Sequence, residues 1–177
     1  MSAARESLRI GRVASPLGGL LVVSDAAGFL RALDFTDCEA RLRRLLRVQS
    51  GGEEPNLLAS AVPAELLESL GAFFRGDLRA LDPLRVRTGG TDFQRRVWAA
   101  LREIPSGATT TYGALARAIG RPSAARAVGH ANGSNPIALV VPCHRVVGSD
   151  GALTGYAGGI ERKRWLLEHE RRWRTAA

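Results

Sequence analysis

The sequence has few of the residues that build a cross-linked or metal-centred protein. Its 177 residues include 2 cysteines, Cys38 and Cys143, and 3 histidines. This pair matches neither a disulfide framework nor the spacing of zinc ligands, so we expect no metal site. Both thiols are expected to be free, as in a reducing cytoplasm.

Long apolar segments are also absent. No run approaches the ~18 apolar residues of a membrane span, and residues 1–9 lack the apolar stretch of a signal peptide. We therefore expect a globular protein without membrane contact, located in the cytoplasm and close to the nucleoid if the source is bacterial.

Negative charge is in deficit. The chain carries 25 Lys and Arg against 17 Asp and Glu, which gives a net charge of +8. A polyanionic partner, most simply nucleic acid, accounts for such an excess. Ordinary solubility charge in an arginine-rich chain is the alternative.

The first half of the chain predicts strands followed by helices. Strands are expected at 8–13, 20–23 and 29–35 as a meander, helices at about 38–46 and 66–74, a polar loop at 49–56 and an extended stretch at 81–86. Cys38 lies beside the apolar stripe of the first helix, which indicates packing. The Gly-containing stretch 88–91 is the candidate linker between an N-terminal domain, 1–87, and a C-terminal domain, 88–177.

The second half predicts helices. One helix is expected from Thr91 or Asp92, as N-cap, to Ile104. A short helix at 112–120 ends at a glycine, and the turn 121–123 leads through Ser123, as N-cap, into a helix at 124–132. This is the helix-turn-helix pattern, although any corner between two helices gives the same pattern.

The second helix of this pair has an almost bare surface. Arg126 is the one long cation among small residues, which are Ala124, Ala125, Ala127, Gly129 and Ala131. Such a surface suits entry into a groove or a base stack. Tight packing of helices, with Arg126 reaching solvent, is the alternative.

A strand is predicted at 137–141, and it ends in Val140-Val141. Pro142-Cys143-His144-Arg145 follows it directly. Pro142 cannot donate to a sheet, so Cys143 is expected at a strand end or tight turn. A nearby histidine, arginine or helix end can lower the pKa of a thiol below its ordinary value near ~8.5 and activate it. A buried, inert cysteine is the alternative.

The motifs from residue 88 to residue 170 resemble the O6-alkylguanine-DNA alkyltransferases, also called methylated-DNA–protein-cysteine methyltransferases. The resemblance rests on Pro142-Cys143-His144-Arg145-Val146, Gly90-Thr91-Asp92-Phe93-Gln94, Thr111-Tyr112-Gly113, Ala124-Ala125-Arg126-Ala127-Val128-Gly129, Asn135-Pro136, Gly155-Tyr156-Ala157-Gly158-Gly159, Lys163 and Glu170. It implies a two-domain α/β (α+β) protein, with an N-terminal ribonuclease-H-like α/β domain and a helical, winged-helix-like DNA-binding domain that carries the cysteine. It also implies one irreversible transfer of an alkyl group from guanine O6 in double-stranded DNA, with O4-alkylthymine as a second candidate, and no cofactor.

The resemblance assigns the chemistry to five residues. Cys143 would accept the alkyl group, His144 would take its proton through a water molecule, and Glu170 would orient His144. Asn135 would tie the recognition helix to the active-site segment. Tyr112 would help to rotate the nucleotide out of the duplex and hydrogen-bond the base.

The resemblance also implies the contacts with DNA and with the flipped base. Arg126 would fill the gap in the base stack; the surrounding DNA-facing residues would be Ala125, Ala127, Gly129, Tyr112 and Ser123. The carbonyls of Val146 and Cys143 would read the guanine amino group, and the Ala157 N–H would meet O6. Tyr156, Arg145 and Ala138 complete the expected pocket, and the small Ala138 favours large adducts such as benzyl.

Two points remain open at the level of sequence. Ser106 departs from the larger residue of some members and predicts looser packing near the end of a helix. A non-catalytic lesion sensor or a redox-sensing helix-turn-helix regulator is the alternative function, although Cys143 is intact and Cys38 has no evident approach to it. We expect a monomer and leave cooperative binding along DNA open.

Overall fold

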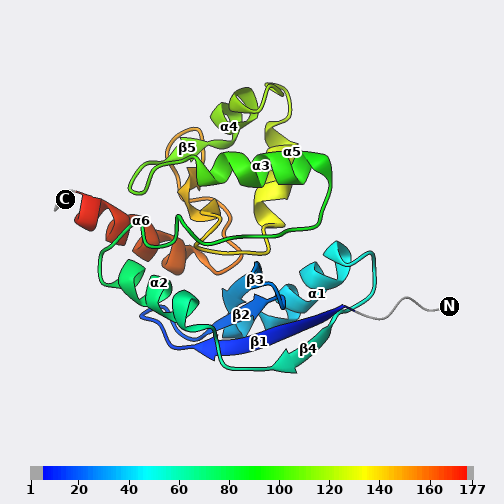
Figure 1. Cartoon of the computed structure of the whole chain (residues 1–177). Helices are drawn as coiled ribbons and strands as arrows, with labels where there is room; N and C mark the ends of the chain where they lie inside the picture. The colour runs from blue at the N-terminus through cyan, green and yellow to red at the C-terminus, as the bar shows by residue number, and fades with distance from the viewer. Residues whose placement is uncertain (1–5, 175–177) are drawn as a thin grey trace.

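A four-stranded sheet carries the first half of the chain (Figure 1). Its strands are β1 (Ser7–Val13), β2 (Leu20–Ser24), β3 (Leu30–Phe35) and β4 (Asn56–Ala59), in the order β3-β2-β1-β4. The first three form the predicted antiparallel meander, and β4 pairs in parallel with β1. The structure, a computed structural model, describes residues 6–174, so part of the stretch 1–9 discussed above lies outside the described residues.

The sheet is apolar on both faces because β2 is a continuous run of Leu and Val. Alternate residues point to opposite faces. Leu21 and Val23 share a cluster with helix α1 (Glu39–Gln49), which follows the 3₁₀ turn η1 (Thr36–Cys38). Leu20 and Val22 belong to the main core with helix α2 (Ala64–Phe74).

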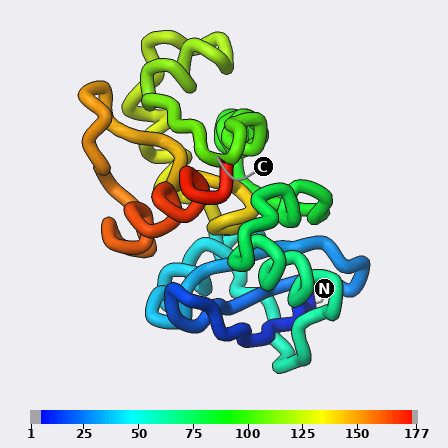
Figure 2. The backbone as a smooth tube through the Cα atoms, turned by 90° about the vertical axis from the view of Figure 1, so that its left-hand side faces the viewer, coloured from blue at the N-terminus to red at the C-terminus, as the bar shows by residue number. Residues whose placement is uncertain are grey.

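The second half is mainly helical and lies on one side of the sheet (Figures 1 and 2). Its elements are α3 (Asp92–Arg102), β5 (Thr110–Thr111), α4 (Tyr112–Ala118), α5 (Ala125–Gly133), the 3₁₀ turn η2 (Cys143–Arg145), β6 (Val146–Val147) and α6 (Ile160–Arg174). Thr91 and Gln94 form a reciprocal capping box at the start of α3. The Trp98 indole donates to the carbonyl of Ala131 over 2.8 Å, which fixes α3 against α5.

Four local predictions are wrong. Residues 81–83 form a turn around Pro83, and Val86 alone bridges to β3. Strand β4 was not predicted, because it is short and largely exposed. Helix α3 ends at Arg102 rather than Ile104. The N-cap of α5 is Ala124 without a side-chain cap, whereas Ser123 lies in the preceding turn, where the Ala124 N–H donates to Arg121.

The apolar stretch 137–141 is also not a strand. Only Ile137 bridges to β3, and the chain then folds into a turn in which the Val141 N–H donates to the Ile137 carbonyl. Leu139 adopts a positive φ of 67°. Asn135 accepts from the Ile137 N–H and donates to the Val141 carbonyl over 2.7 Å, so its amide supplies the bonds that a strand partner would have supplied.

The two halves share one apolar core. The main cluster joins Leu33 and Phe73 from the first half to Trp98, Val128 and Ile137 from the second. The result is the mixed, two-part α+β architecture that the sequence predicts. Within residues 6–174, no helix is long and apolar enough to cross a membrane.

Candidate active site

Cys143 begins the tight turn η2, directly after Pro142, and its side chain belongs to the core. The residue is 7% exposed. Its backbone is held on both sides: the N–H donates to the Val141 carbonyl over 2.8 Å, and the carbonyl accepts from Asn132 Nδ2 over 3.3 Å. The turn that follows Pro142 is as the sequence predicts.

Burial raises the pKa of the Cys143 thiol above its ordinary value; contributions from Asn135, Arg41 and Lys163 act in the opposite direction and are smaller. The expectation of a lowered pKa is therefore wrong for the unliganded protein. A buried thiolate loses much of its hydration, which disfavours the charged form. A buried thiol of this kind needs a base that removes its proton during the reaction.

His144 supplies a candidate base. Its Nε2 lies 2.7 Å from Glu170 Oε1, and both side chains are fully buried. An ionised carboxylate only accepts hydrogen bonds, so the hydrogen between the two side chains is carried by Nε2. His144 Nδ1 has no hydrogen-bond partner among the described residues, so it is the ring nitrogen left to exchange a proton with the thiol.

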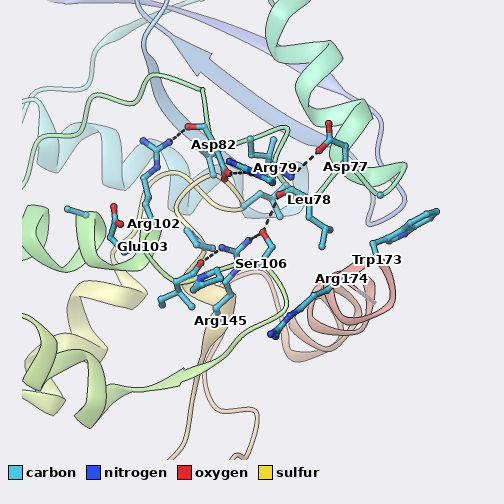
Figure 3. A pocket seen from close by; sticks show the side chains of 18 residues that line it. Asp77, Leu78, Arg79, Asp82, Arg102, Glu103, Ser106, Arg145, Trp173 and Arg174 are labelled. Carbon is cyan, nitrogen blue, oxygen red and sulfur yellow. Dashed lines mark hydrogen bonds and ion pairs between the residues drawn. The ribbon is translucent and has the colours of Figure 1, made fainter. Parts of the chain in front are cut away.

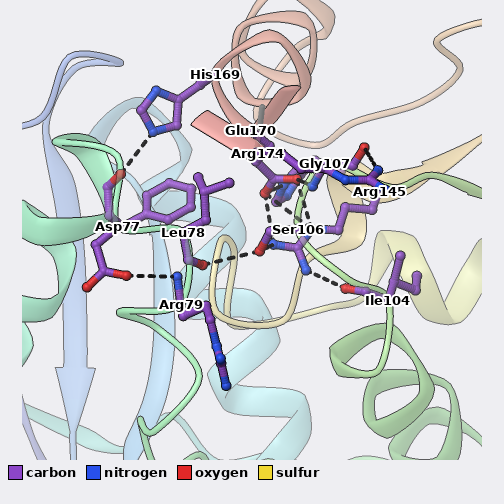
Figure 4. Close-up of polar contacts among 12 residues, drawn as sticks. Asp77, Leu78, Arg79, Ile104, Ser106, Gly107, Arg145, His169, Glu170 and Arg174 are labelled. Carbon is purple, nitrogen blue, oxygen red and sulfur yellow. Dashed lines mark hydrogen bonds and ion pairs between the residues drawn. The ribbon is translucent and has the colours of Figure 1, made fainter. Parts of the chain in front are cut away.

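Glu170 is held as a carboxylate by two neighbours. Burial alone would raise its pKa, but the facing His144 and Arg145 outweigh burial and lower the pKa to about 2. Arg145 donates to Glu170 from Nε and from Nη2, and the Gly107 N–H donates to Oε2 over 3.0 Å (Figure 4). The carboxylate is thus ionised at neutral pH and fixed in orientation.

Arg145 departs from the expectation that it lines the base pocket. Its guanidinium faces Glu170, the Ile104 carbonyl at 2.6 Å and the Ser106 hydroxyl at 2.9 Å (Figure 4). Ser106 also donates to the Leu78 carbonyl over 3.2 Å. The looser packing expected at Ser106 stays a prediction: the residue lines a cavity, and its hydroxyl joins Arg145 to the chain of the first half.

A cavity of about 790 Å³ lies behind the active-site turn (Figure 3). Leu139, Val140, Pro142 and Arg145 line it from the side of the turn, and Trp173 lines it from α6. Cys143 is not among the lining residues. The two faces of the turn are therefore distinct: the thiol belongs to one, and the Arg145 guanidinium to the other.

On the thiol side lie the predicted loop 155–159 and a buried lysine. The Tyr156 hydroxyl is buried without a partner among the described residues, and burial followed by the nearby Cys143 raises its pKa well above the ordinary value. Lys163 Nζ donates to the Val146 carbonyl over 2.6 Å and to the Thr154 carbonyl over 2.7 Å. Lys163 thereby braces the backbone that is expected to read guanine.

The remaining expected pocket residues occupy different settings. Ala157 is exposed, and its carbonyl accepts a hydrogen bond from the Cys38 thiol over 3.7 Å. Ala138 is buried, and its N–H donates to the Leu33 carbonyl of β3. Cys38 packs against the main core, which confirms the predicted packing role, and its thiol also contacts the pocket loop.

Asn132 and Arg41 were missed at the level of sequence. Asn132 is 5% exposed and holds the Cys143 carbonyl. Arg41, on α1, ion-pairs with Asp34 and donates to the carbonyls of Gly133 and Asn135. Sequence gave no signal for Arg41, because its partners are backbone atoms more than ninety positions away.

The predicted DNA-facing residues lie together at α4 and α5. Tyr112 is the first residue of α4. Its ring lies beside Gly129: a Cβ atom added to this glycine would be 3.8 Å from the ring, an ordinary contact distance. A surface hollow of about 630 Å³ is lined by Arg44, Tyr112, Ala125, Arg126, Gly129, His130, Gly133 and Ser134. Arg126, Ala127 and Ser123 are exposed.

The helix-turn-helix pair and the buried thiol with its histidine base together define a class: a nucleic-acid-binding protein with a nucleophilic cysteine. The family model described as "6-O-methylguanine DNA methyltransferase, DNA binding domain" matches residues 92–172. This range covers every element from α3 to η2 and most of α6.

Individual relatives extend the match to about nine-tenths of the chain. A protein of Salmonella typhimurium named methylated-DNA–protein-cysteine methyltransferase is 50% identical over 90% of this chain and 93% of its own length. A protein of the same name from Methanosarcina barkeri is 42% identical over 89% of this chain and 94% of its own. The crystal structure of Mycobacterium tuberculosis OGT in complex with DNA matches with a TM-score of 0.77 at 39% identity, covering 93% of this chain and 94% of that one. The chain belongs to the methylated-DNA–protein-cysteine methyltransferase family.

Proposed function

We propose that this protein repairs alkylated DNA by direct reversal, through transfer of the alkyl group of O6-alkylguanine to Cys143. The observation that carries the proposal is the pairing of a buried thiol with a histidine whose Nε2 is bound by Glu170 and whose Nδ1 is unbonded. The names of the relatives support the same reaction.

The transfer needs one proton movement and one substitution. A water molecule carries the Cys143 proton to His144 Nδ1, and Glu170 stabilises the imidazolium that forms. The thiolate sulfur then attacks the alkyl carbon, so that the S–C bond forms and the C–O6 bond breaks. The bonding electrons remain on guanine, which takes up the proton that Cys143 released, so that charge is balanced; a hydrogen bond from Tyr112 assists the release of the base. A thioether is a poor leaving group, so each protein molecule reacts once and no cofactor takes part.

The base must leave the duplex before its O6 reaches Cys143. Unstacking costs a few kcal/mol, and side chains that stabilise the extrahelical base offset it. Arg126 is exposed on a helix of small residues and is proposed to fill the gap in the stack. The resemblance to the alkyltransferases implies that this helix enters the minor groove, unlike the usual major-groove docking of the helix-turn-helix. The unpartnered Tyr156 hydroxyl and the carbonyls of Cys143 and Val146 are proposed to meet the flipped base.

The wider arrangement follows from the same proposal. Double-stranded DNA is the partner, with O4-alkylthymine as a second substrate, and the protein acts as a monomer in the cytoplasm. Residues 1–87 and 88–177 are proposed as its two domains; the range of the family match supports the second.

The alternative is a lesion sensor or a redox regulator that binds DNA without chemistry. The Cys38 thiol bonds to the Ala157 carbonyl, which brings it near the pocket loop and gives this reading its one structural support. Enzymatic digestion of the DNA separates the two. After incubation of the protein with a duplex containing O6-methylguanine, repair predicts that the lesion becomes guanine with no abasic site. A sensor leaves the lesion unchanged although it binds the duplex.

A further inference from the structure

Most arginines of residues 6–174 have a hydrogen-bond or ion-pair partner within the protein, and five of the six that have none lie on α1, α4, α5 or the turn between α4 and α5. Guanidinium groups without a hydrogen bond or ion pair among the described residues belong to Arg9, Arg44, Arg47, Arg117, Arg121 and Arg126. Three of these lie on or between α4 and α5, the helices expected at DNA. Two others, Arg44 and Arg47, lie on α1 of the first half.

Helix α1 carries two arginines with partners and two without. Arg41 bonds to Asp34 and to the end of α5, and Arg43 bonds to Glu39 and Glu54. Arg44 and Arg47 are exposed, without partners, and stand three residues apart, so they share one face of the helix. The positive charge of this face is not paired with any group of the described residues.

Arg44 places this positive charge next to the surface of α4 and α5. Arg44 lines the same hollow as Tyr112, Ala125, Arg126 and Gly129. Arg41, one turn earlier, holds the C-terminal end of α5 through Gly133. In Figure 1, α1 lies below the end of α5. The charged face of α1 is therefore continuous with the surface on which α5 would contact DNA.

We infer that Arg44 and Arg47 of α1 bind phosphates of the duplex that flanks the lesion, so that the DNA interface extends onto the N-terminal half. This rests on the proposed function and adds to it a part of the chain outside the helix-turn-helix. Phosphates are the partner that an exposed, unpaired arginine pair fits, and such contacts position the protein without reading sequence. They strengthen binding to damaged and undamaged duplexes alike.

The test is the salt dependence of binding. In a Cys143→Ala background, which binds without reacting, the affinity for an O6-methylguanine duplex is measured by fluorescence anisotropy at several salt concentrations. Each neutralised phosphate contributes about 0.9 to the slope of log affinity against log salt. Arg44→Ala and Arg47→Ala are each expected to reduce the slope by about 0.9. Across a fourfold range of salt, each is expected to remove roughly a 3.5-fold change in affinity.

Arg9→Ala is the matched control. It also removes an exposed, unpaired arginine. Leu8 of β1 packs with α1, and the neighbouring Arg9 points to the opposite face of the strand, away from α1. Its slope should equal that of the parent. In the Cys143-intact protein, Arg44→Ala should react with free O6-benzylguanine at the parent rate. Unchanged slopes for both α1 variants, or an equal reduction in Arg9→Ala, would overturn the inference. If the parent fails to restore guanine in DNA, the proposed function itself fails.

Discussion

At the scale of single residues, the site is organised around one carboxylate. Glu170 binds the His144 imidazole, the Arg145 guanidinium and the Gly107 N–H at once. The base, the active-site turn and the segment after α3 are therefore aligned by one side chain. Cys143 itself is a buried thiol with a raised pKa, so reactivity depends on the histidine rather than on a resting thiolate.

Replacement of Glu170 tests this arrangement. Glu170→Gln is expected to slow transfer strongly while undamaged DNA is still bound, because the imidazolium loses its counter-charge. It also leaves the buried Arg145 guanidinium without its counter-charge, at a cost of about 3–5 kcal/mol in unfolding free energy. Single-turnover rates and urea titrations measure the two effects. A variant as fast as the parent would contradict the role of Glu170.

The same variant has a defined pH signature. The pKa of Glu170 is about 2 in the folded protein and near 4.5 in the unfolded chain. A depressed carboxyl pKa stabilises the folded state fully above the unfolded value, and this stabilisation is lost as pH falls towards the folded value. The difference in unfolding free energy between parent and Glu170→Gln should therefore be constant near neutral pH and shrink below about pH 4.5. A constant difference down to pH about 3 would show that the carboxylate is not the stabilising form.

At the scale of elements, α5 presents on one side the surface that we propose for DNA and is held from behind on the other. Arg126 projects from the exposed side. Arg41 and Trp98 hold the C-terminal part of the helix through backbone carbonyls. The helix is thus fixed at its C-terminal end, and its exposed surface carries Arg126 and His130 among small residues.

Substitutions of two arginines of the helix-turn-helix should have different effects on the transfer rate and on the salt dependence of binding. Arg126→Ala is expected to slow transfer on duplex DNA by about tenfold for each ~1.4 kcal/mol of flipped-state stabilisation lost. The free base needs no flipping, so its rate should be nearly normal and the salt slope little changed. Arg121→Ala should give the reverse, a shallower salt slope with a modest change in rate. Equal slowing of both substrates by Arg126→Ala would make Arg126 a structural residue.

Substitution of Arg41 is expected to give a third pattern of effects on stability, transfer rate and salt slope. Its loss removes bonds to Asn135 and Gly133 and leaves the buried Asp34 unpaired, so unfolding free energy should fall by about 1.5–3 kcal/mol. Because Asn135 holds the active-site turn, Arg41→Ala should slow transfer on duplex and free base alike. The salt slope should not change. A shallower slope with a normal free-base rate would instead identify Arg41 as a phosphate contact.

At the scale of the whole molecule, the two halves act as one body. His169 of α6 bonds to the Phe73 carbonyl of α2, and Arg162 bonds to Asp37, both over about 3 Å. The Arg162 guanidinium also stacks on Phe35 and donates to the Gly158 carbonyl of the pocket loop. The first half therefore braces the reactive second half as well as packing against it.

The sequence predicted elements whose apolar pattern is local and failed where long-range bonds decide. The strands of the meander, the Thr91 cap and α4 follow from periodicity and capping residues. The stretch 137–141 was misassigned because its β-branched run gives no hint of the Asn135 bonds that fold it. The residues of the Cys143 site were found through a resemblance, whereas Arg41 and Asn132 act through backbone carbonyls and leave no pattern to read.

The account depends most directly on Cys143 as the acceptor in a reaction that occurs once. Intact-protein mass spectrometry after incubation with excess O6-methylguanine duplex, followed by peptide mapping, tests chemistry, stoichiometry and site together. The account predicts the added mass of one methyl group per molecule, on Cys143 and not on Cys38, and no added mass in Cys143→Ala. Several lesions repaired per molecule, methylation of Cys38, or repair that survives Cys143→Ala would contradict it.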